Sequence, residues 1–310
     1  MKLTVFTPTY NRAYIIENLY RSLQRQTCHD FEWLVVDDGS SDNTKALFDT
    51  WQKEENPFPI RYFYKENGGK HRAINYAVPL AAGELFFIVD SDDYLTDDAA
   101  EIILDQFAEL RQDSRLKFAG VCNCRGYSLT EIMGTTFDGE SIDCTMLERE
   151  QYGITGDKAE VFYTDVMQKY PFPEFHGEKF ITECAVWDKM AEDGFYLRFF
   201  NQITYLCNYR QDGLTMQGMD LFYRNPFGYG YALRLARRNR KYRRELSDYL
   251  DAGCYWHWKK TMPTEKIAKL IGTSKSKLLW VSYKQQFRQI MSKIKSRIMK
   301  LMRVSNHGHS

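Results

Sequence analysis

An uninterrupted apolar run followed at once by three carboxylates is the feature that most constrains this chain. Leu85 to Val89 contains only aliphatic and aromatic side chains, and Asp90, Asp92 and Asp93 follow within four positions. Such a run, rich in aromatic and β-branched residues, is typical of a strand buried on both faces of a mostly parallel sheet. In open α/β sheets, ligands bind beyond the carboxyl ends of the strands, so the acidic cluster lies where a site is expected.

The acidic cluster has two interpretations. Asp90 and Asp92 are two positions apart with Asp93 at the turn beyond, so together they offer hard oxygen ligands to one small cation such as Mg²⁺ or Mn²⁺. Alternatively, the loop caps the helix that follows, a role that Asp97 and Asp98 would continue. Short acidic motifs are common, so this stretch alone leaves both interpretations open.

Three earlier strands are also followed directly by polar loops. Strands are expected over residues 3–6, 32–36 and 60–64, and the loops that follow cover residues 7–12, 37–42 and 67–72. Each loop leads into an expected helix. This alternation predicts right-handed βαβ crossovers, which bring all the loops to one edge of the sheet.

The third of these loops contains two glycines before a cationic side chain. Gly68 and Gly69 let the backbone approach an anion at a helix N-terminus, with Lys70 and Arg72 beside it. The loop lacks the full spacing of a P-loop, so a simple glycine turn that starts a helix is the alternative.

The second half of the chain is less regular. Helices are expected over residues 97–112 and 181–191, and strands over residues 118–123, 134–137 and 195–206, whereas residues 138–162 show no readable pattern. Glu183 falls in the first turn of the second of these helices. A carboxylate is favoured there by the helix dipole, which is its simplest explanation.

Cysteine usage and hydropathy indicate a compartment. The seven cysteines show no CxxC spacing, so neither a zinc site nor a disulfide framework is expected, and a reducing cytosol is the simplest location. The N-terminus runs directly into a strand, and no apolar run approaches the roughly 20 residues that span a bilayer. We therefore expect a cytoplasmic protein that does not cross a membrane.

The net charge of +1 hides a strong asymmetry. From Ala232 onward the chain contains 20 of its 42 lysines and arginines but only four of its 41 aspartates and glutamates. This segment therefore carries a net charge of +16 and the remainder −15. A basic region of this kind implies an anionic partner, which is a membrane surface, a nucleic acid or the acidic part of the chain itself.

A helix over residues 284–303 combines these charges with an apolar face. The apolar side chains recur at helical spacing, with lysines and arginines on the flanking and opposite faces. An anionic membrane surface is the expected partner, because the register is apolar-striped and not interleaved for base stacking, which argues against nucleic acid. Packing onto the body of the protein is the alternative. The apolar residues are Phe287, Ile290, Met291, Ile294, Ile298, Leu301 and Met302.

Three spaced motifs resemble those of the family 2 glycosyltransferases with a GT-A fold. They are Thr7-Pro8-Thr9-Tyr10-Asn11-Arg12, Val35-Val36-Asp37-Asp38-Gly39-Ser40-Ser41-Asp42 and Ile88-Val89-Asp90-Ser91-Asp92-Asp93. The resemblance implies an α/β fold with a Rossmann-like, mostly parallel sheet flanked by helices. It places a nucleotide-binding half at residues 1–95 and an acceptor half at residues 96–220, ahead of a basic helical C-terminal region at 221–310.

The resemblance also implies how the nucleoside is held. Pro8 and Tyr10 match the turn that holds it, with Tyr10 placed to pack on the base. Asp38 matches the carboxylate that accepts a hydrogen bond from uracil. Arg12 and Lys70 are further candidates for binding the nucleotide.

The acidic loop matches the DxD motif of the family. There the first carboxylate, here Asp90, lies near the ribose, and the second, here Asp92, holds Mn²⁺ or Mg²⁺ on the diphosphate. Asp90 is also a candidate metal ligand, Asp93 is the alternative to Asp92, and Ser91 between them is assigned to nucleotide binding.

This chain departs from the family's pattern at the position of the catalytic base. Inverting members take the proton of the acceptor hydroxyl with a carboxylate from a Glu-Asp pair that opens a helix. The matching segment here reads Ile181-Thr182-Glu183-Cys184, so Cys184 stands where the Asp is expected. The resemblance then assigns the base to Glu183, with Asp188 as the alternative.

The resulting expectation is an inverting, metal-dependent glycosyltransferase. It would move a sugar from a nucleotide-diphospho-sugar, expected to be a UDP-sugar, to a carbohydrate or lipid-linked carbohydrate in surface polysaccharide synthesis at the inner face of the cell membrane. Two alternatives remain, a sugar-phosphate nucleotidyltransferase and a membrane-associated, non-catalytic protein with a degenerate fold. The first would need a glycine-rich loop after the first strand, and residues 7–12 contain no glycine.

Overall fold

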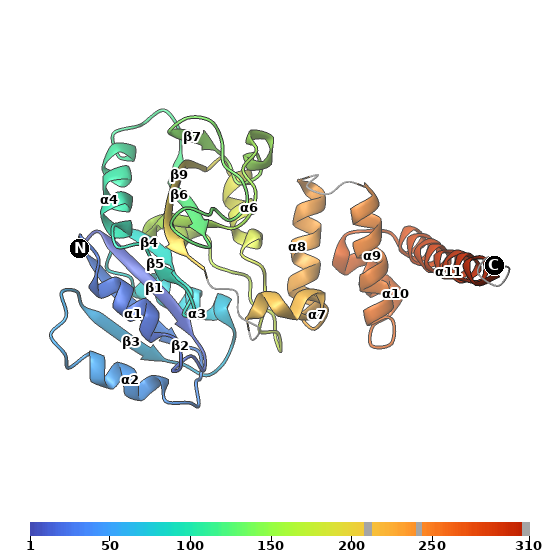
Figure 1. The fold of residues 1–310 in the computed structure, drawn as a ribbon, viewed down its shortest axis with the longest axis horizontal. Coiled ribbons are helices and arrows are strands. Elements are labelled where there is room, and N and C mark those ends of the chain that lie inside the picture. Colours follow the sequence, from blue (N-terminus) through green and yellow to red (C-terminus); the bar gives the residue numbers. More distant parts are fainter. Residues whose placement is uncertain (208–212, 240–243, 306–310) are drawn as a thin grey trace. The chain divides into compact units, whose positions relative to one another are not determined.

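The chain forms two compact units in a computed structural model (Figure 1). The structure describes residues 1–207, 213–239 and 244–305, with the backbone alone for residues 214, 215, 289 and 293–305. The units are Met1–Leu221 and Phe222–Ser310, and each is described by itself. Within the described ranges, no helix has the length and apolar character needed to span a membrane.

Among its described residues, 1–207 and 213–221, the first unit is built on one mixed, mostly parallel sheet of nine strands. Its strand order is β3-β2-β1-β4-β8-β6-β9-β5, with β7 paired to β9. β1 pairs in parallel with β2 and β4, and β2 with β3, as right-handed crossovers require. The bounds are β1 Leu3–Thr9, β2 Phe31–Asp37, β3 Ile60–Tyr64, β4 Leu85–Ile88, β5 Tyr94–Leu95, β6 Phe118–Gly126, β7 Ser141–Cys144, β8 Lys158–Tyr163 and β9 Tyr196–Leu206. The predicted α/β, Rossmann-like fold is confirmed.

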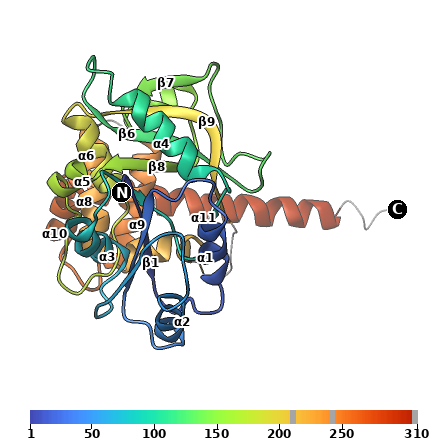
Figure 2. The ribbon, with the colours of Figure 1, turned by 90° about the vertical axis from the view of Figure 1, so that its left-hand side faces the viewer.

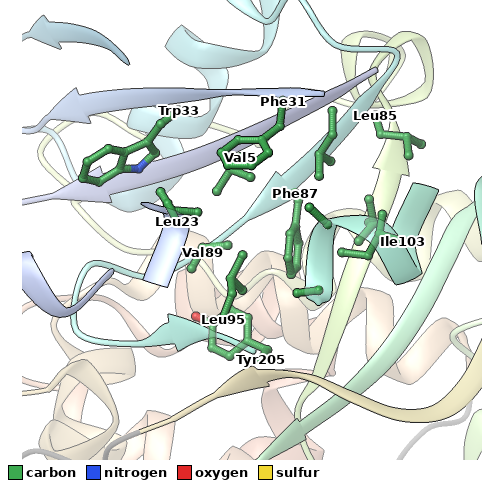
Figure 3. Close-up of a cluster of buried hydrophobic side chains, with 14 of the residues drawn as sticks. Val5, Leu23, Phe31, Trp33, Leu85, Phe87, Val89, Leu95, Ile103 and Tyr205 are labelled. Carbon is green, nitrogen blue, oxygen red and sulfur yellow. The ribbon is translucent and has the colours of Figure 1, made fainter. Parts of the chain in front are cut away.

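Helices cover both faces of this sheet. Alternate residues of the central strands, such as Val5, Phe87 and Val89, pack against α1 and α4 in one apolar core (Figure 3). α3 lies against the opposite face of β1 and β2, and α6 joins that face where Trp187 packs on Phe162 with ring centroids 4.4 Å apart. The bounds are α1 Glu17–Gln24, α2 Thr44–Trp51, α3 Lys70–Ala77, α4 Ala99–Leu110, α5 Thr164–Lys169 and α6 Cys184–Glu192.

Burial of large apolar side chains explains why the central strands are easy to recognise in the sequence. Trp33, Phe87 and Tyr205 are fully buried in this core. Removing an aromatic side chain of this size from water stabilises a fold by about 1.5–3 kcal/mol. The apolar strands β1, β2 and β4 therefore bring the polar loops that follow them to one edge of the sheet.

Two predictions for the second half of this unit were wrong. Residues 134–137 form no strand, because their backbone turns at Gly134 with a φ of 82°. Residues 138–162 are not irregular throughout, since they contain β7 and most of β8. β8 lies in the middle of the sheet, antiparallel to both β4 and β6. Its polar Lys158 and Glu160 hide the apolar pattern of the strand.

The second unit is helical. α7 (Gly218–Tyr223) spans the point of division, and α8 (Pro226–Arg238), α9 (Arg244–Trp258) and α10 (Thr264–Ile271) follow. These helices share an apolar core with the start of α11 (Lys275–Ser305). The core includes Leu233, Tyr255, Ile267 and Leu278. α11 extends beyond the other helices of this unit (Figure 2). It begins nine residues earlier than the predicted start at residue 284.

Candidate functional site

The loops after β1 and β2 are joined at the edge of the sheet by Asn11. Its backbone N–H donates to Ser40 Oγ at 2.8 Å, and its side-chain oxygen accepts from the backbone N–H of Ser41 at 2.8 Å. Asn11 has a φ of 52°, a left-handed conformation that asparagine tolerates better than most residues. The two motifs that are 30 residues apart in the sequence thus form one surface.

Asp38 organises the turn that precedes α3. Its buried carboxylate accepts hydrogen bonds from Lys65 Nζ at 2.5 Å, Asn67 Nδ2 at 3.1 Å and the backbone N–H groups of Gly68 and Gly69 at 2.9 and 2.6 Å. Four donors use the full acceptor capacity of a carboxylate. The predicted hydrogen bond from uracil to Asp38 would have to compete with these donors, and it stays a prediction.

Gly69 fixes the direction in which α3 begins. Its φ of 97° is one that only glycine adopts readily, and a Cβ there would lie 1.9 Å from the carbonyl oxygen of Lys179. The next residue, Lys70, therefore starts the helix with its side chain directed along the sheet edge.

Lys70 joins two of the predicted site residues. Its Nζ lies 2.5 Å from Asp90 Oδ1 and 2.9 Å from Glu183 Oε1. Burial opposes the charge on Lys70, but the two carboxylates outweigh it and raise the pKa of the ammonium above its usual value. Asp90 is opposed by burial in the same way, and Lys70 and Arg125 lower its pKa. The structure thus brings together residues from three distant parts of the sequence.

Asp92 and Asp93 differ in their surroundings. Asp92 makes one long ion pair, 3.9 Å from its Oδ2 to Arg12 NH2, and is partly exposed. Asp93 is buried and accepts a hydrogen bond from the hydroxyl of Tyr205 at 2.9 Å. Burial and the nearby Asp90 raise the pKa of Asp93 to about 6. Asp93 is therefore held within the fold, whereas the side chains of Asp90 and Asp92 are 25% and 21% exposed.

The described residues provide no ready-made metal cage. Nowhere among them do three histidine, cysteine, aspartate or glutamate side chains converge as ligands for one ion. Asp90 already faces Lys70 and Arg125, which leaves Asp92 as the more available carboxylate. One or two carboxylates suffice for a cation that takes its other ligands from a substrate diphosphate.

The remaining nucleotide candidates line the same edge. Pro8 lies within β1, paired in register with Val36, and Tyr10 just beyond it is 49% exposed. Arg12 donates from NH1 to the hydroxyl of Tyr14 at 2.9 Å. Ser91 is buried between the carboxylates of the acidic loop. An exposed aromatic ring beside a charged loop suits stacking on a flat base.

Glu183 occupies the N-cap position of α6, one residue before the helix, and not its first turn as predicted. Cys184 beside it is exposed. The alternative base, Asp188, is a residue of α6 and only 3% exposed, so it is less accessible to an acceptor than Glu183. Of the two, Glu183 is the carboxylate that reaches the cluster of Lys70 and Asp90.

Three residues of the site escaped the sequence analysis. Arg125 on β6 lies 3.7 Å from Asp90 Oδ2, with its guanidinium over the ring of Tyr205. Tyr205 on β9 accepts a hydrogen bond from the backbone N–H of Asp90 at 2.9 Å. Burial raises the pKa of Glu160 on β8 to about 7, against the effect of Arg125 and Arg149. For Arg125, the available signal was a lone arginine at the end of the mostly apolar residues 118–124.

Comparisons with known proteins agree with this geometry. Residues 4–121 match the family model of glycosyl transferase family 2. The chain is 26% identical over 275 residues to the GalNAc(5)-diNAcBac-PP-undecaprenol beta-1,3-glucosyltransferase of Campylobacter jejuni, a match that covers 82% of each chain. It is 32% identical over 112 residues to glycosyltransferase GlyG of Streptococcus pneumoniae, which is 36% of each chain.

Solved structures share the fold at low identity. S. aureus TarS 1-349 in complex with UDP-GlcNAc aligns with a TM-score of 0.61 and 21% identity, over 86% of this chain and 75% of that one. The mannosyltransferase PcManGT from Pyrobaculum calidifontis, in complex with GDP-Man and Mn²⁺, aligns with a TM-score of 0.54 and 17% identity, over 96% and 80%. The motifs, the fold and the family model agree: residues 4–121 match glycosyl transferase family 2, and the first unit has the GT-A fold of these solved structures.

Proposed function

We propose that this glycosyltransferase is an inverting, metal-dependent enzyme that takes its sugar from a UDP-sugar. The observation that carries the proposal is the double ion pair of Lys70, which joins Asp90 of the DxD loop to Glu183. By the resemblance, Asp90 lies on the side of the cluster that would face the donor, and Glu183 on the side that would face the acceptor. A single cluster therefore contains the groups that one direct displacement requires.

The donor side would hold the nucleotide and the diphosphate. Tyr10 would pack on the base, Asp38 would shape the neighbouring turn, and Asp92 would hold Mn²⁺ or Mg²⁺. A bound cation neutralises the charge that develops on the departing diphosphate. Lys70 and Arg12 add positive charge at the same edge. These groups favour the transition state because the charge grows as the sugar–phosphate bond breaks.

The acceptor side would activate a hydroxyl group. A sugar hydroxyl is a weak nucleophile near neutral pH, so a carboxylate within hydrogen-bond reach must take its proton as the new bond forms. Glu183 would do this from the N-cap position of α6, where Lys70 holds one of its oxygens at 2.9 Å. Direct attack from the face opposite the diphosphate inverts the anomeric centre.

The acceptor would be a carbohydrate or lipid-linked carbohydrate of a surface polysaccharide, handled at the cytoplasmic face of the membrane. The similarity to a relative whose name specifies an undecaprenol-linked glycan supports this acceptor class. The basic, amphipathic α11 supports the location, since such helices bind anionic membrane surfaces. The same region would keep the enzyme near its acceptor.

Calorimetric titration with UDP and GDP, with and without Mn²⁺, tests the donor side. The intact chain should bind UDP more tightly in Mn²⁺, and Asp92→Asn should remove that metal dependence. Asp98→Asn, a carboxylate of the next turn, should leave it unchanged. Binding of neither nucleotide under any condition would contradict the proposed donor.

A further inference from the structure

The second unit contains a pocket between the start of α9 and the exposed part of α11. The pocket has a volume of about 290 Å³, and Val281 lies in its wall. Its charged lining consists of Arg244, Lys284 and Arg288, together with Glu245 and Asp248. We refer to it as the cationic pocket, because positive side chains outnumber negative ones.

The three cations of the pocket have no carboxylate partner in the described part of the chain. No ion pair within 4.0 Å involves Arg244, Lys284 or Arg288 there, although Asp248 pairs with Lys277 at 3.8 Å. Elsewhere in this unit Arg237 pairs with the buried Asp251. Since these three cations outnumber the two carboxylates of the lining, Glu245 and Asp248, an anion entering the pocket would meet a net positive charge.

A row of apolar side chains runs along α11 next to the pocket. Its members are 48–64% exposed and follow one another at helical spacing, so they share a face beside the one that carries Lys284 and Arg288. The ammonium of Lys284 lies 4.3 Å from the ring centroid of Trp280. Tryptophan and tyrosine beside lysine are typical of the interface between a membrane and water. This apolar row consists of Trp280, Tyr283, Phe287, Ile290 and Met291.

Apart from Tyr283, whose ring packs on Tyr255 and Trp256 with ring centroids 6.3 and 5.9 Å apart, the apolar row is not part of the core of its own unit. Leu278, on another side of the same helix, is fully buried and packs in that core, and Val281 is fully buried as well. The side chains of Ile294, Ile298, Leu301 and Met302, which the sequence predicts to continue the row, lie outside the described residues. The apolar row is thus an exposed face of a helix whose other side already packs in the core of the unit.

Charge decides which partner fits this face. Between Lys275 and Ser305 the sequence contains nine lysines and arginines and no aspartate or glutamate. A second copy of α11 would bring an equal density of positive charge against the first, which disfavours self-association. A membrane surface with anionic phospholipids offers apolar and negatively charged groups together.

We propose that the cationic pocket and the apolar row form one site for an anionic phospholipid, with its phosphate in the pocket and its acyl chains along the row. The site adds a specific ligand to the proposed membrane association. It rests on that proposal, because the membrane would supply the phospholipid. It is independent of the transfer chemistry in the first unit. Each part can therefore fail in experiment without the other.

Flotation of the full chain with vesicles tests the site. The vesicles are phosphatidylcholine alone or phosphatidylcholine with about 30 mol% phosphatidylglycerol, a fraction that gives a strongly anionic surface. Lys284→Gln with Arg288→Gln tests the pocket, and Phe287→Ser with Ile290→Ser tests the row. Lys260→Gln with Lys269→Gln removes the same charge from exposed positions away from the pocket and serves as the matched control.

We expect the intact chain to bind the anionic vesicles and not the neutral ones. Each lysine or arginine near an anionic surface changes the partition coefficient about fivefold, so the pocket variant should bind roughly 30-fold more weakly. The row variant should lose affinity too, while the control stays within about twofold if location matters as well as charge. Thermal unfolding of every variant should match that of the intact chain.

Three results would overturn the site. An equal loss in the control variant would show attraction by diffuse charge and not by the pocket. Self-association that the row variant abolishes would assign the face to a second copy. Binding of a DNA duplex with the same dependence on Lys284 and Arg288 would assign the pocket to nucleic acid. None of these results would affect the nucleotide titration of the first unit.

Discussion

The two units place their charged side chains differently. In the first unit, Lys70, Asp90 and Glu183 form a cluster at the sheet edge in which each charge has a partner within the unit. In the second unit, Arg244 and Arg288 reach the surface without a carboxylate partner among the described residues. A closed cluster suits chemistry that occurs within the protein, because its groups hold one another in place. Unpaired cations suit a partner that comes from outside.

Breaking the closed cluster should have the largest effect on stability. Lys70→Met leaves Glu183 without its ion-pair partner and Asp90 with Arg125 alone, so we expect the free energy of unfolding to fall by about 3 kcal/mol. Urea unfolding at neutral pH measures it. Lys45→Met is the control, because Lys45 pairs with Asp49 at the surface and its loss should cost less than about 0.5 kcal/mol. Equal losses of unfolding free energy in Lys70→Met and Lys45→Met would contradict a cluster whose members depend on one another.

The pH dependence of stability sharpens the same comparison. Burial raises the pKa of Glu160 from 4.5 to about 7, against the effect of Arg125 and Arg149. Between these two values the folded chain retains a proton that the unfolded chain has lost, so stability should fall as the pH rises from about 4.5 to about 7. The loss should be on the order of 3 kcal/mol and should level off above that range.

Glu160→Gln should remove this part of the pH dependence, measured by urea unfolding at several pH values. Glu150→Gln, at an exposed position, serves as the control and should leave the profile unchanged. An unaltered slope in Glu160→Gln would show that its carboxyl titrates like an exposed one.

The smallest effect is expected on the exposed face of α11. Phe287→Ser should change the free energy of unfolding by less than about 0.5 kcal/mol, because its side chain is 64% exposed. Leu278→Ala on the same helix should cost about 3 kcal/mol, since Leu278 is fully buried. Thermal unfolding of both variants measures the difference. A large cost for Phe287→Ser would mean that this face packs within the protein.

Some strands could be predicted from the sequence and others could not. Strands β1, β2 and β4 were readable because both of their faces are buried and largely apolar, and the polar loops that follow them lie at the predicted edge. β8 was missed because Lys158 and Glu160 interrupt its apolar residues. Lys158 is buried only because the carbonyl oxygens of Met133 and Thr155 accept its hydrogen bonds, which no local pattern reveals.

The candidate site was predictable only in part. Asp90 and Asp92 follow a buried strand and match the DxD motif, and these two features marked them. Arg125 and Tyr205 reach Asp90 through the pairing of β6 with β8 and β9, strands that lie far along the chain from β4. Contacts of that kind depend on sheet register, which single-sequence patterns do not determine. The ion pair between Lys70 and Glu183 was hidden for the same reason.

The most direct test of the account is the release of UDP from a panel of UDP-sugars by the intact chain and by Glu183→Gln. With the base removed, the rate should fall by about 10²- to 10⁴-fold, while calorimetric binding of UDP with Mn²⁺ stays the same. Cys184→Ser, at the neighbouring exposed position, should keep its rate and so exclude a general disturbance of α6. An unchanged rate in Glu183→Gln would contradict the assignment of the base and with it the proposed mechanism.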